Sequence, residues 1–189
     1  MFVLALTAGL RQGETLALYW EDIDLEAGTL TVKRQVQRKR RDGSDLHEPG
    51  LVFSRPKSKK GHRTIRLSAI ALEALRSHQE RQLQEKQGAG ARYHDRGLVF
   101  ATTIGTPLDA QNVVNRHFKP LLRHAGLPPI RFHDLRHTCA TLLAGKNVNP
   151  KIVQDTLGHA SLSMTLGIYS HVQAAMKDEA AAAMNSTFS

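Results

Sequence analysis

The chain has 189 residues, of which 41% are hydrophobic, and this is enough for one domain with its own core. Lys and Arg number 26 against 17 Asp and Glu, and the net charge of +9 favours a polyanion such as nucleic acid over an acidic small molecule as the partner. The sequence has neither an apolar run of about 18 residues that could span a bilayer nor a signal peptide. We therefore expect no membrane association and a location in the cytoplasm.

The first part of the chain predicts short helices followed by strands. Helices are expected over residues 1–10 and 14–18, with Arg11 at the break between them. Period-two alternation and β-branched residues predict strands at 29–36, 51–53 and 63–67. The last two strands are expected to form the arms of a hairpin whose tip is the basic loop 56–61.

The rest of the chain is predicted to be mainly helical. Capping residues and apolar periodicity predict a short strand at 98–100 and helices at 69–87, 109–125, 133–144, 150–157, 161–168 and 172–183. Together the elements predict an α+β fold, mainly α, in which a helical domain carries a small antiparallel sheet on one side. We expect one domain over residues 1–172 and a tail helix within 173–189.

Basic side chains gather on the predicted strands and on the hairpin tip. Such a cluster can be a solvated face, but its position on adjacent strands favours a surface that follows the phosphates of DNA. The residues expected to contact DNA are Lys33, Arg34, Arg38, Lys57, Lys60 and Arg63.

His133 and Arg136 predict an anion site. They lie three residues apart at the start of a predicted helix, so they share a face beside the positive end of the helix dipole. His133 and His137 also have the spacing of the zinc motif H-E-x-x-H, but Asp134 replaces the glutamate and Arg136 would lie beside the metal. We therefore expect no metal at this position.

Four segments carry a family resemblance. They read TAGLRQGE, HDLRHT, LGHAS and IYSHV, at residues 7–14, 133–138, 157–161 and 168–172. In this order they resemble the successive motif boxes of the tyrosine recombinase (phage integrase) family. The resemblance implies the catalytic domain of a site-specific recombinase or integrase, as found in mobile genetic elements, which cleaves and rejoins DNA strands through a 3′-phosphotyrosyl intermediate.

The resemblance also implies a role for each matching residue. Tyr169 would be the nucleophile, and its phenol, with an ordinary pKa of about 10, needs a cationic pocket or a base nearby. Arg11 and Arg136 would clamp the phosphate oxygens, because forked guanidiniums can hold the charge that develops on them. His133 would handle the phenol proton, and His159 would donate a hydrogen bond to the phosphate.

Two further roles concern residues outside this set. Glu14 is expected to orient the arginines as a supporting anion rather than to react. A lysine at the hairpin tip would protonate the departing 5′ oxygen; Lys59 fits best, and Lys57 stays open. The reaction implied by the resemblance requires no cofactor, neither a metal ion nor a nucleotide.

Alternatives remain at the level of the whole protein. Family members usually carry a helical domain and one further helix ahead of a segment like this one, and both are expected to be missing here. The chain could therefore be a truncated DNA-binding remnant that no longer recombines, and a type IB topoisomerase shares the same chemistry. We expect double-stranded DNA as the partner and a homotetramer on DNA assembled through the tail, with a monomer possible in its absence.

Overall fold

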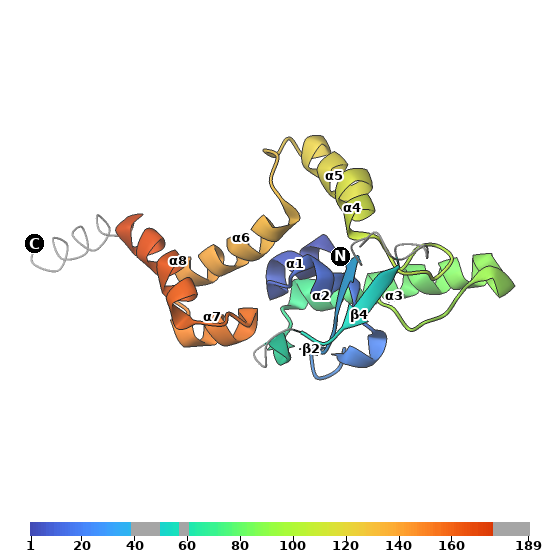
Figure 1. Ribbon diagram of the computed structural model, residues 1–189, viewed down its shortest axis with the longest axis horizontal. Coiled ribbons are helices and arrows are strands. Elements are labelled where there is room, and N and C mark those ends of the chain that lie inside the picture. Colours follow the sequence, from blue (N-terminus) through green and yellow to red (C-terminus); the bar gives the residue numbers. More distant parts are fainter. Residues whose placement is uncertain (39–49, 57–60, 176–189) are drawn as a thin grey trace, which may run out of the picture.

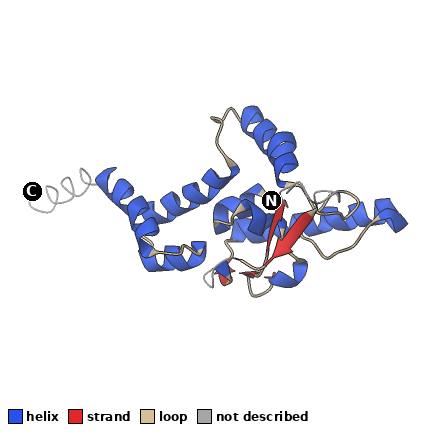
Figure 2. Ribbon diagram, in the orientation of Figure 1, coloured by secondary structure: helices blue, strands red, loops and turns tan. Residues whose placement is uncertain are grey.

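The computed structural model describes residues 1–38, 50–56 and 61–175. Its helices are α1 (Phe2–Ala8), α2 (Gln12–Leu16), α3 (Ala69–Ala89), α4 (Ala110–Val113), α5 (Lys119–His124), α6 (Phe132–Gly145), α7 (Pro150–Leu157) and α8 (Leu162–Ala175). Its strands are β1 (Ile23–Asp24), β2 (Thr29–Val32), β3 (Gln35–Arg38), β4 (Leu51–Ser54) and β5 (Arg63–Arg66). Helices α6 to α8 lie at one end of the molecule and α3 at the other (Figure 1). The strands gather on one side between them (Figure 2), so the predicted mainly helical fold with small antiparallel sheets is confirmed.

The strands form two sheets instead of the predicted hairpin. Strands β1, β2 and β5 make one antiparallel sheet, and β3 pairs with β4 in another. The predicted strand 29–36 is interrupted at residues 33 and 34, and the expected arms 51–53 and 63–67 pair with different partners. The reason is burial: the β2–β5 register sets Leu30 opposite Ile65, and both side chains are buried in the core.

Three smaller predictions also change. Residues 98–100 form only an isolated bridge between Leu98 and Tyr19 instead of a strand. The helix predicted over 109–125 contains a π-helical turn, η4 (Val114–Phe118), ahead of Pro120, which has no N–H for the helical ladder. Helix α8 continues through the expected boundary at residue 172 as far as Ala175; the remainder of the expected tail lies outside the described residues.

Two apolar clusters meet beside α1. The larger one packs α1 and α3 against the three-stranded sheet. The second joins α6, α7 and α8 through residues that include Cys139, Leu157 and Tyr169. Gly9 lies where they meet: it ends α1 with a left-handed φ of 61°, and a Cβ there would stand 2.2 Å from Leu157 Cδ2. Only glycine allows both this conformation and this close approach. None of the helices within the described ranges is long and apolar enough to cross a membrane.

Candidate active site

Glu14 lies at the centre of a buried cluster of arginines. Its side chain is 2% exposed and belongs to the first turn of α2. Glu14 Oε2 accepts a hydrogen bond of 3.0 Å from the backbone N–H of Arg11, which caps the helix, and Oε1 accepts one of 2.6 Å from Arg11 Nη1. On its other side the carboxylate accepts from Nη1 and Nη2 of Arg63, at 3.2 and 2.9 Å. Glu14 therefore fixes both guanidiniums from between them.

Arg63, which was expected to contact DNA, is buried in the structure, and its contact with DNA stays a prediction. Its side chain is only 6% exposed and points inward from β5. Besides Glu14, it binds two backbone carbonyls: Nε donates to Thr156 O at 2.7 Å, and Nη1 donates to Gly61 O at 3.1 Å. The charge run that includes Arg63 resembled a surface feature in the sequence, but the alternation of β5 turns this residue to the buried face.

Arg136 provides a third guanidinium, from α6. This helix begins with Asp134 accepting the backbone N–H of Arg131 at 2.8 Å, so its first turn is well capped. Arg136 is 3% exposed, and its Nη1 donates to Gly9 O at 2.8 Å. Its Nη2 is buried and has no hydrogen-bond partner in the part of the chain that the structure describes. Burial and the charges of Arg11 and Arg63 lower the pKa of Arg136 to about 9. The three guanidiniums thus face one carboxylate, Glu14, and a donor of Arg136 is left without an acceptor among the described residues.

Two histidines, His133 and His159, lie near the arginines. His159 is 7% exposed and follows Gly158, whose left-handed conformation ends α7 and whose carbonyl accepts from Arg11 Nη2 at 3.2 Å. His159 Nδ1 lies 2.9 Å from Thr165 Oγ1. Burial, then Arg136 and Arg11, lower the pKa of His159 to about 4, and the same causes lower the pKa of the more exposed His133. Both imidazoles are therefore neutral at pH 7.

The hydroxyl of Tyr169 is not among the groups that bind the arginines. Its ring is 6% exposed and packs in the cluster of α6, α7 and α8. The hydroxyl donates a hydrogen bond to the carbonyl of Val148, in the turn before α7. Burial raises the pKa of Tyr169, so the phenol is protonated in this conformation. Its proton is engaged in the hydrogen bond to Val148 O.

The predicted DNA-contacting residues fall into two groups. Lys57, Lys60 and the proposed acid Lys59 lie outside the described residues. Lys33 and Arg34 pair with Asp22, at 3.0 and 2.6 Å, and Arg34 also pairs with Glu21. Arg38 is 60% exposed and stands 3.5 Å from Asp109. Contacts of these residues with DNA stay a prediction.

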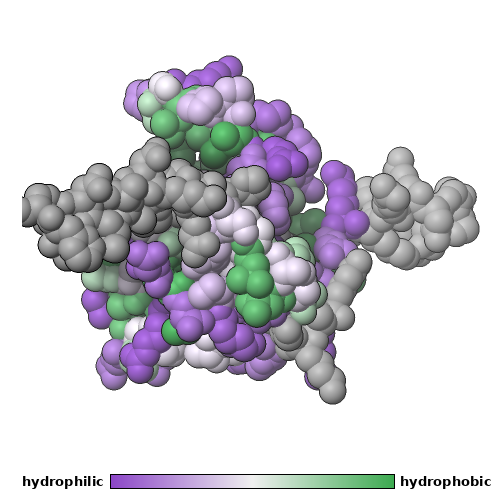
Figure 3. All heavy atoms as spheres, turned by 90° about the vertical axis from the view of Figure 1, so that its left-hand side faces the viewer, coloured by the Kyte–Doolittle hydropathy of each residue, from purple (hydrophilic) through white to green (hydrophobic). Residues whose placement is uncertain are grey.

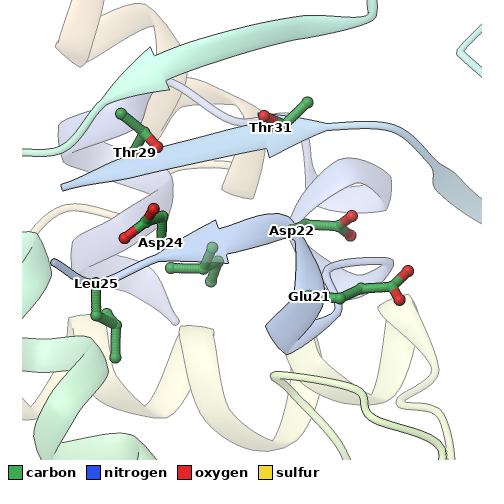
Figure 4. Close-up of a pocket in the computed structure, with 7 residues that line it drawn as sticks. Glu21, Asp22, Asp24, Leu25, Thr29 and Thr31 are labelled. Atoms are coloured by element: carbon green, nitrogen blue, oxygen red, sulfur yellow. The ribbon is translucent and has the colours of Figure 1, made fainter. Parts of the chain in front are cut away.

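A hollow of about 470 Å³ is lined by carboxylates and lies apart from the arginines. Glu21, Asp22 and Asp24 line it with Thr29 and Thr31 of β2 (Figure 4). Asp22 and Glu21 point toward one end of the hollow, away from Asp24. Lys33 and Arg34 pair with Asp22 and Glu21, but the side chains that line the hollow itself include no cation, so the arginine cluster remains the candidate anion site. Within the described residues, no group of three or more His, Cys, Asp and Glu side chains could hold a metal ion.

Sequence reasoning missed the groups that hold the arginines in place. They are four backbone carbonyls, of Gly9, Gly61, Thr156 and Gly158, and a carbonyl carries no signal in a residue pattern. Thr165 was also missed; it is fully buried and contacts His159, not an arginine. Its position six residues after His159, at the start of the next helix, was the available signal.

The fold is an α+β domain, mainly helical, and it carries a cluster of three arginines around one carboxylate. The chain belongs to the phage integrase family, which it matches over residues 1–176. The resemblance inferred from the motifs is thereby confirmed.

Three similar proteins illustrate the match. A tyrosine recombinase XerC-like protein of Caldanaerobacter subterraneus subsp. tengcongensis is 37% identical over 196 residues, covering 100% of this chain and 49% of that protein. The transposase from transposon Tn916 of Enterococcus faecalis is 30% identical, covering 89% of this chain and 41% of its own length. The Tn1549 transposon integrase, solved in complex with a circular intermediate DNA, superposes with a TM-score of 0.73 at 27% identity, covering 98% of this chain and 57% of that one. This chain spans about half the length of the curated relatives it matches.

Proposed function

We propose that this chain is the catalytic domain of a site-specific DNA recombinase or integrase, which cleaves and rejoins strands through a 3′-phosphotyrosyl bond. The observation that carries the proposal is Nη2 of Arg136, a buried donor for which the described residues offer no acceptor. It belongs to a cluster of three guanidiniums around one carboxylate. A phosphodiester of DNA would supply an acceptor and a negative charge for this donor. Because the relatives are bacterial proteins, we propose that the reaction takes place in the cytoplasm of a prokaryote.

Arg11 and Arg136 are the proposed phosphate clamps. Attack on a phosphodiester passes through a five-coordinate phosphorus whose non-bridging oxygens gain negative charge, and donors already in place stabilise that charge without reorganising. Arg11 is 38% exposed and so can be reached, while Glu14 and Gly158 hold its orientation. An anion beside Arg136 favours its charged form and so raises its lowered pKa.

The histidines take complementary roles in the proposed reaction. His133 is neutral at pH 7, so it can accept the phenol proton of Tyr169. His159 is also neutral, and a ring whose Nδ1 accepts from Thr165 carries its proton on Nε2 and can donate to a phosphate oxygen.

The chemical step balances without a cofactor. The Tyr169 oxygen bonds to phosphorus, the bond from phosphorus to the 5′ oxygen breaks, and Lys59, or Lys57 in its place, protonates that oxygen. The phosphotyrosyl bond retains the energy of the broken phosphodiester, so a 5′ hydroxyl can reseal the strand. Before attack, Tyr169 has to release the carbonyl of Val148.

A nicked suicide substrate tests the proposal. Cleavage beside the nick releases a short fragment that diffuses away, which traps the covalent complex. We expect a pool of nicked duplexes with randomised sequence to yield an adduct that survives denaturing electrophoresis, and Tyr169→Phe to abolish it. An adduct that persists in this variant would refute Tyr169 as the nucleophile.

A non-recombining DNA-binding remnant is the second candidate, and the hydrogen bond of the Tyr169 hydroxyl to Val148 is the observation that favours it. Duplex binding without an adduct on any substrate would support this reading. Relaxation of supercoiled plasmid would instead indicate a type IB topoisomerase.

We also propose assembly as a homotetramer on DNA through the C-terminal segment. Figure 3 views the end of the molecule that carries α7 and α8, and apolar patches stand among hydrophilic ones there. Large apolar side chains of this region are 44–59% exposed: Leu142, Ile152, Met164 and Leu166. Contact with another copy would bury them. Chemical cross-linking with duplex present is expected to give tetramers that a chain ending at residue 175 cannot form; equal yields would contradict the role of the tail.

A further inference from the structure

Arg63 makes an unusual set of contacts for a residue of a basic strand. It donates four hydrogen bonds, to Thr156 O, Gly61 O and both oxygens of Glu14, at 2.7 to 3.2 Å. Its side chain is 6% exposed. These hydrogen bonds of the guanidinium are thus all made to groups of the protein itself. The role of Arg63 therefore depends on the function of the groups that accept these bonds.

The acceptors of Arg63 are linked to Arg11. Arg11 binds Glu14 with Nη1 and the carbonyl of Gly158 with Nη2. Arg63 binds the same Glu14 carboxylate, and it binds the carbonyl of Thr156, two residues before Gly158 in the last turn of α7. Arg63 therefore shares one anchor of Arg11, Glu14, and binds two residues before the other, Gly158, so that the contacts link α2, β5 and α7 in a ring.

We propose that Arg63 is a positioning residue for the recombination reaction, holding Glu14 and the end of α7 so that the guanidinium of Arg11 faces the scissile phosphate. This inference rests on the proposed function. The planar fork is essential to the role, because three acceptors in different directions require donors on several nitrogens. A lysine keeps the charge, but its single ammonium cannot span them.

Arg63→Lys is the first test. We expect the variant to fold, to bind duplex DNA within about threefold of the unsubstituted chain, and to form the Tyr169 adduct about 100-fold more slowly, since a small misplacement of a clamp costs that much. Arg66→Lys is the matched control: it lies on the same strand, is exposed, and makes one long contact of 3.4 Å to Ala27 O. An unchanged adduct rate in Arg63→Lys overturns the proposal.

A double-mutant cycle separates positioning from general loss of structure. If Arg63 acts through Arg11, adding Arg63→Lys to an Arg11→Lys chain produces little further loss of rate. If the two losses multiply in full, Arg63 acts independently of Arg11 and the proposal is wrong.

A substrate with sulfur in place of the bridging 5′ oxygen separates the clamp from the leaving group. A thiolate leaves without protonation, so this substrate bypasses the general acid. We expect the Arg63→Lys defect to persist on it. Full recovery would place the effect in leaving-group protonation and overturn the assignment to Arg11.

One readout does not depend on turnover. Burial, Arg136 and Arg11 lower the pKa of His159, so a displaced Arg11 lets that pKa rise even when residue 63 keeps its charge. NMR titration of His159 is expected to show this rise in Arg63→Lys and none in Arg66→Lys; an unchanged titration in both overturns the inference. Failure of the unsubstituted chain to form any adduct would instead refute the proposed function and leave this titration interpretable.

Discussion

Glu14 and Arg63 form a buried ion pair, with Oε2 of the carboxylate 2.9 Å from Nη2 of the guanidinium and neither side chain more than 6% exposed. Burial alone would raise the pKa of Glu14, yet the hydrogen bonds and charges of Arg63 and Arg11 hold it below its usual value. The carboxylate therefore stays ionised at the centre of the cluster, and its charge opposes those of the buried Arg63 and Arg136 and of the half-buried Arg11.

Glu14→Gln tests this dependence. The substitution keeps the shape of the side chain but removes the charge that opposes the guanidiniums. We expect the free energy of unfolding, measured with urea, to fall by about 3 to 5 kcal/mol, the usual cost of breaking a buried pair. Adduct formation is expected to fall with it, since Arg11 loses its anchor.

The control for Glu14→Gln is Glu21→Gln. Glu21 also pairs with an arginine, Arg34, but its side chain is 63% exposed. Exposed pairs contribute at most about 1 kcal/mol. Equal losses of unfolding free energy in the two variants would mean that Glu14 stabilises the fold no more than an exposed ion pair does.

Arg136→Met is expected to separate stability from activity. The guanidinium of Arg136 is buried with one nitrogen unpartnered among the described residues, so its charge is costly to the folded state. We expect the variant to keep the stability of the parent chain or to gain about 1 kcal/mol. Adduct formation is expected to fall by a factor of about 100 to 1000, as when one transition-state donor is removed. A large loss of stability would show instead that the bond to Gly9 outweighs the desolvation.

Gly9→Ala probes the contact between α1 and α7. The new methyl group would stand 2.2 Å from Leu157 Cδ2, on a backbone with φ of 61°. We expect a loss of about 2 to 4 kcal/mol in urea unfolding. Gly88→Ala is the control, because that position is helical with no atom within 4 Å, and it is expected to gain about 0.5 to 1 kcal/mol. If both variants gain stability, the approach of Gly9 to Leu157 does not require a glycine.

The stability of the protein is expected to rise from pH 4 to pH 6.5. The pKa of His159 is lowered from 6.5 to about 4, so between these values the unfolded chain binds the proton and the folded chain does not. Stability therefore falls as the pH drops through this window, by up to about 3 kcal/mol from this residue. Chemical unfolding at several pH values should show a smaller slope in His159→Gln. Part of the slope remains, because the pKa values of His78 and His133 are lowered too.

Several residues of the candidate site could be predicted from the sequence because they belong to short motifs in which the spacing of the side chains is recognisable. The placement of Arg11, Glu14, Arg136 and His159 in one cluster follows from short motifs, and the helices that carry them were expected near their observed ranges. The pairing of strands could not be predicted in the same way. Residues 29–36 were predicted as one alternating strand, but Lys33 and Arg34 turn toward Asp22, and the segment is divided between two sheets.

The burial of Arg63 and the orientation of Tyr169 depend on contacts distant in sequence. Arg63 reaches Thr156, 93 residues away, and such a pairing leaves no periodic trace. The bond from Tyr169 to Val148 joins the side chain to a backbone oxygen, which every residue type provides. Motifs therefore indicate the candidate reactive groups, while the packing of α7 and α8 determines where their side chains lie in this structure.

The position of the Tyr169 hydroxyl has a consequence for how tightly DNA is held. Freeing the phenol breaks its bond to Val148 and exposes a ring that is 6% accessible in the resting chain. Under the proposed function, part of the free energy gained on contact with DNA would go into this rearrangement, so the affinity would be weaker than the contacts alone would give. A DNA duplex that makes too few contacts can be bound and released uncut. Selectivity for the correct duplex can thus appear in the rate of strand cleavage even when binding strength differs little.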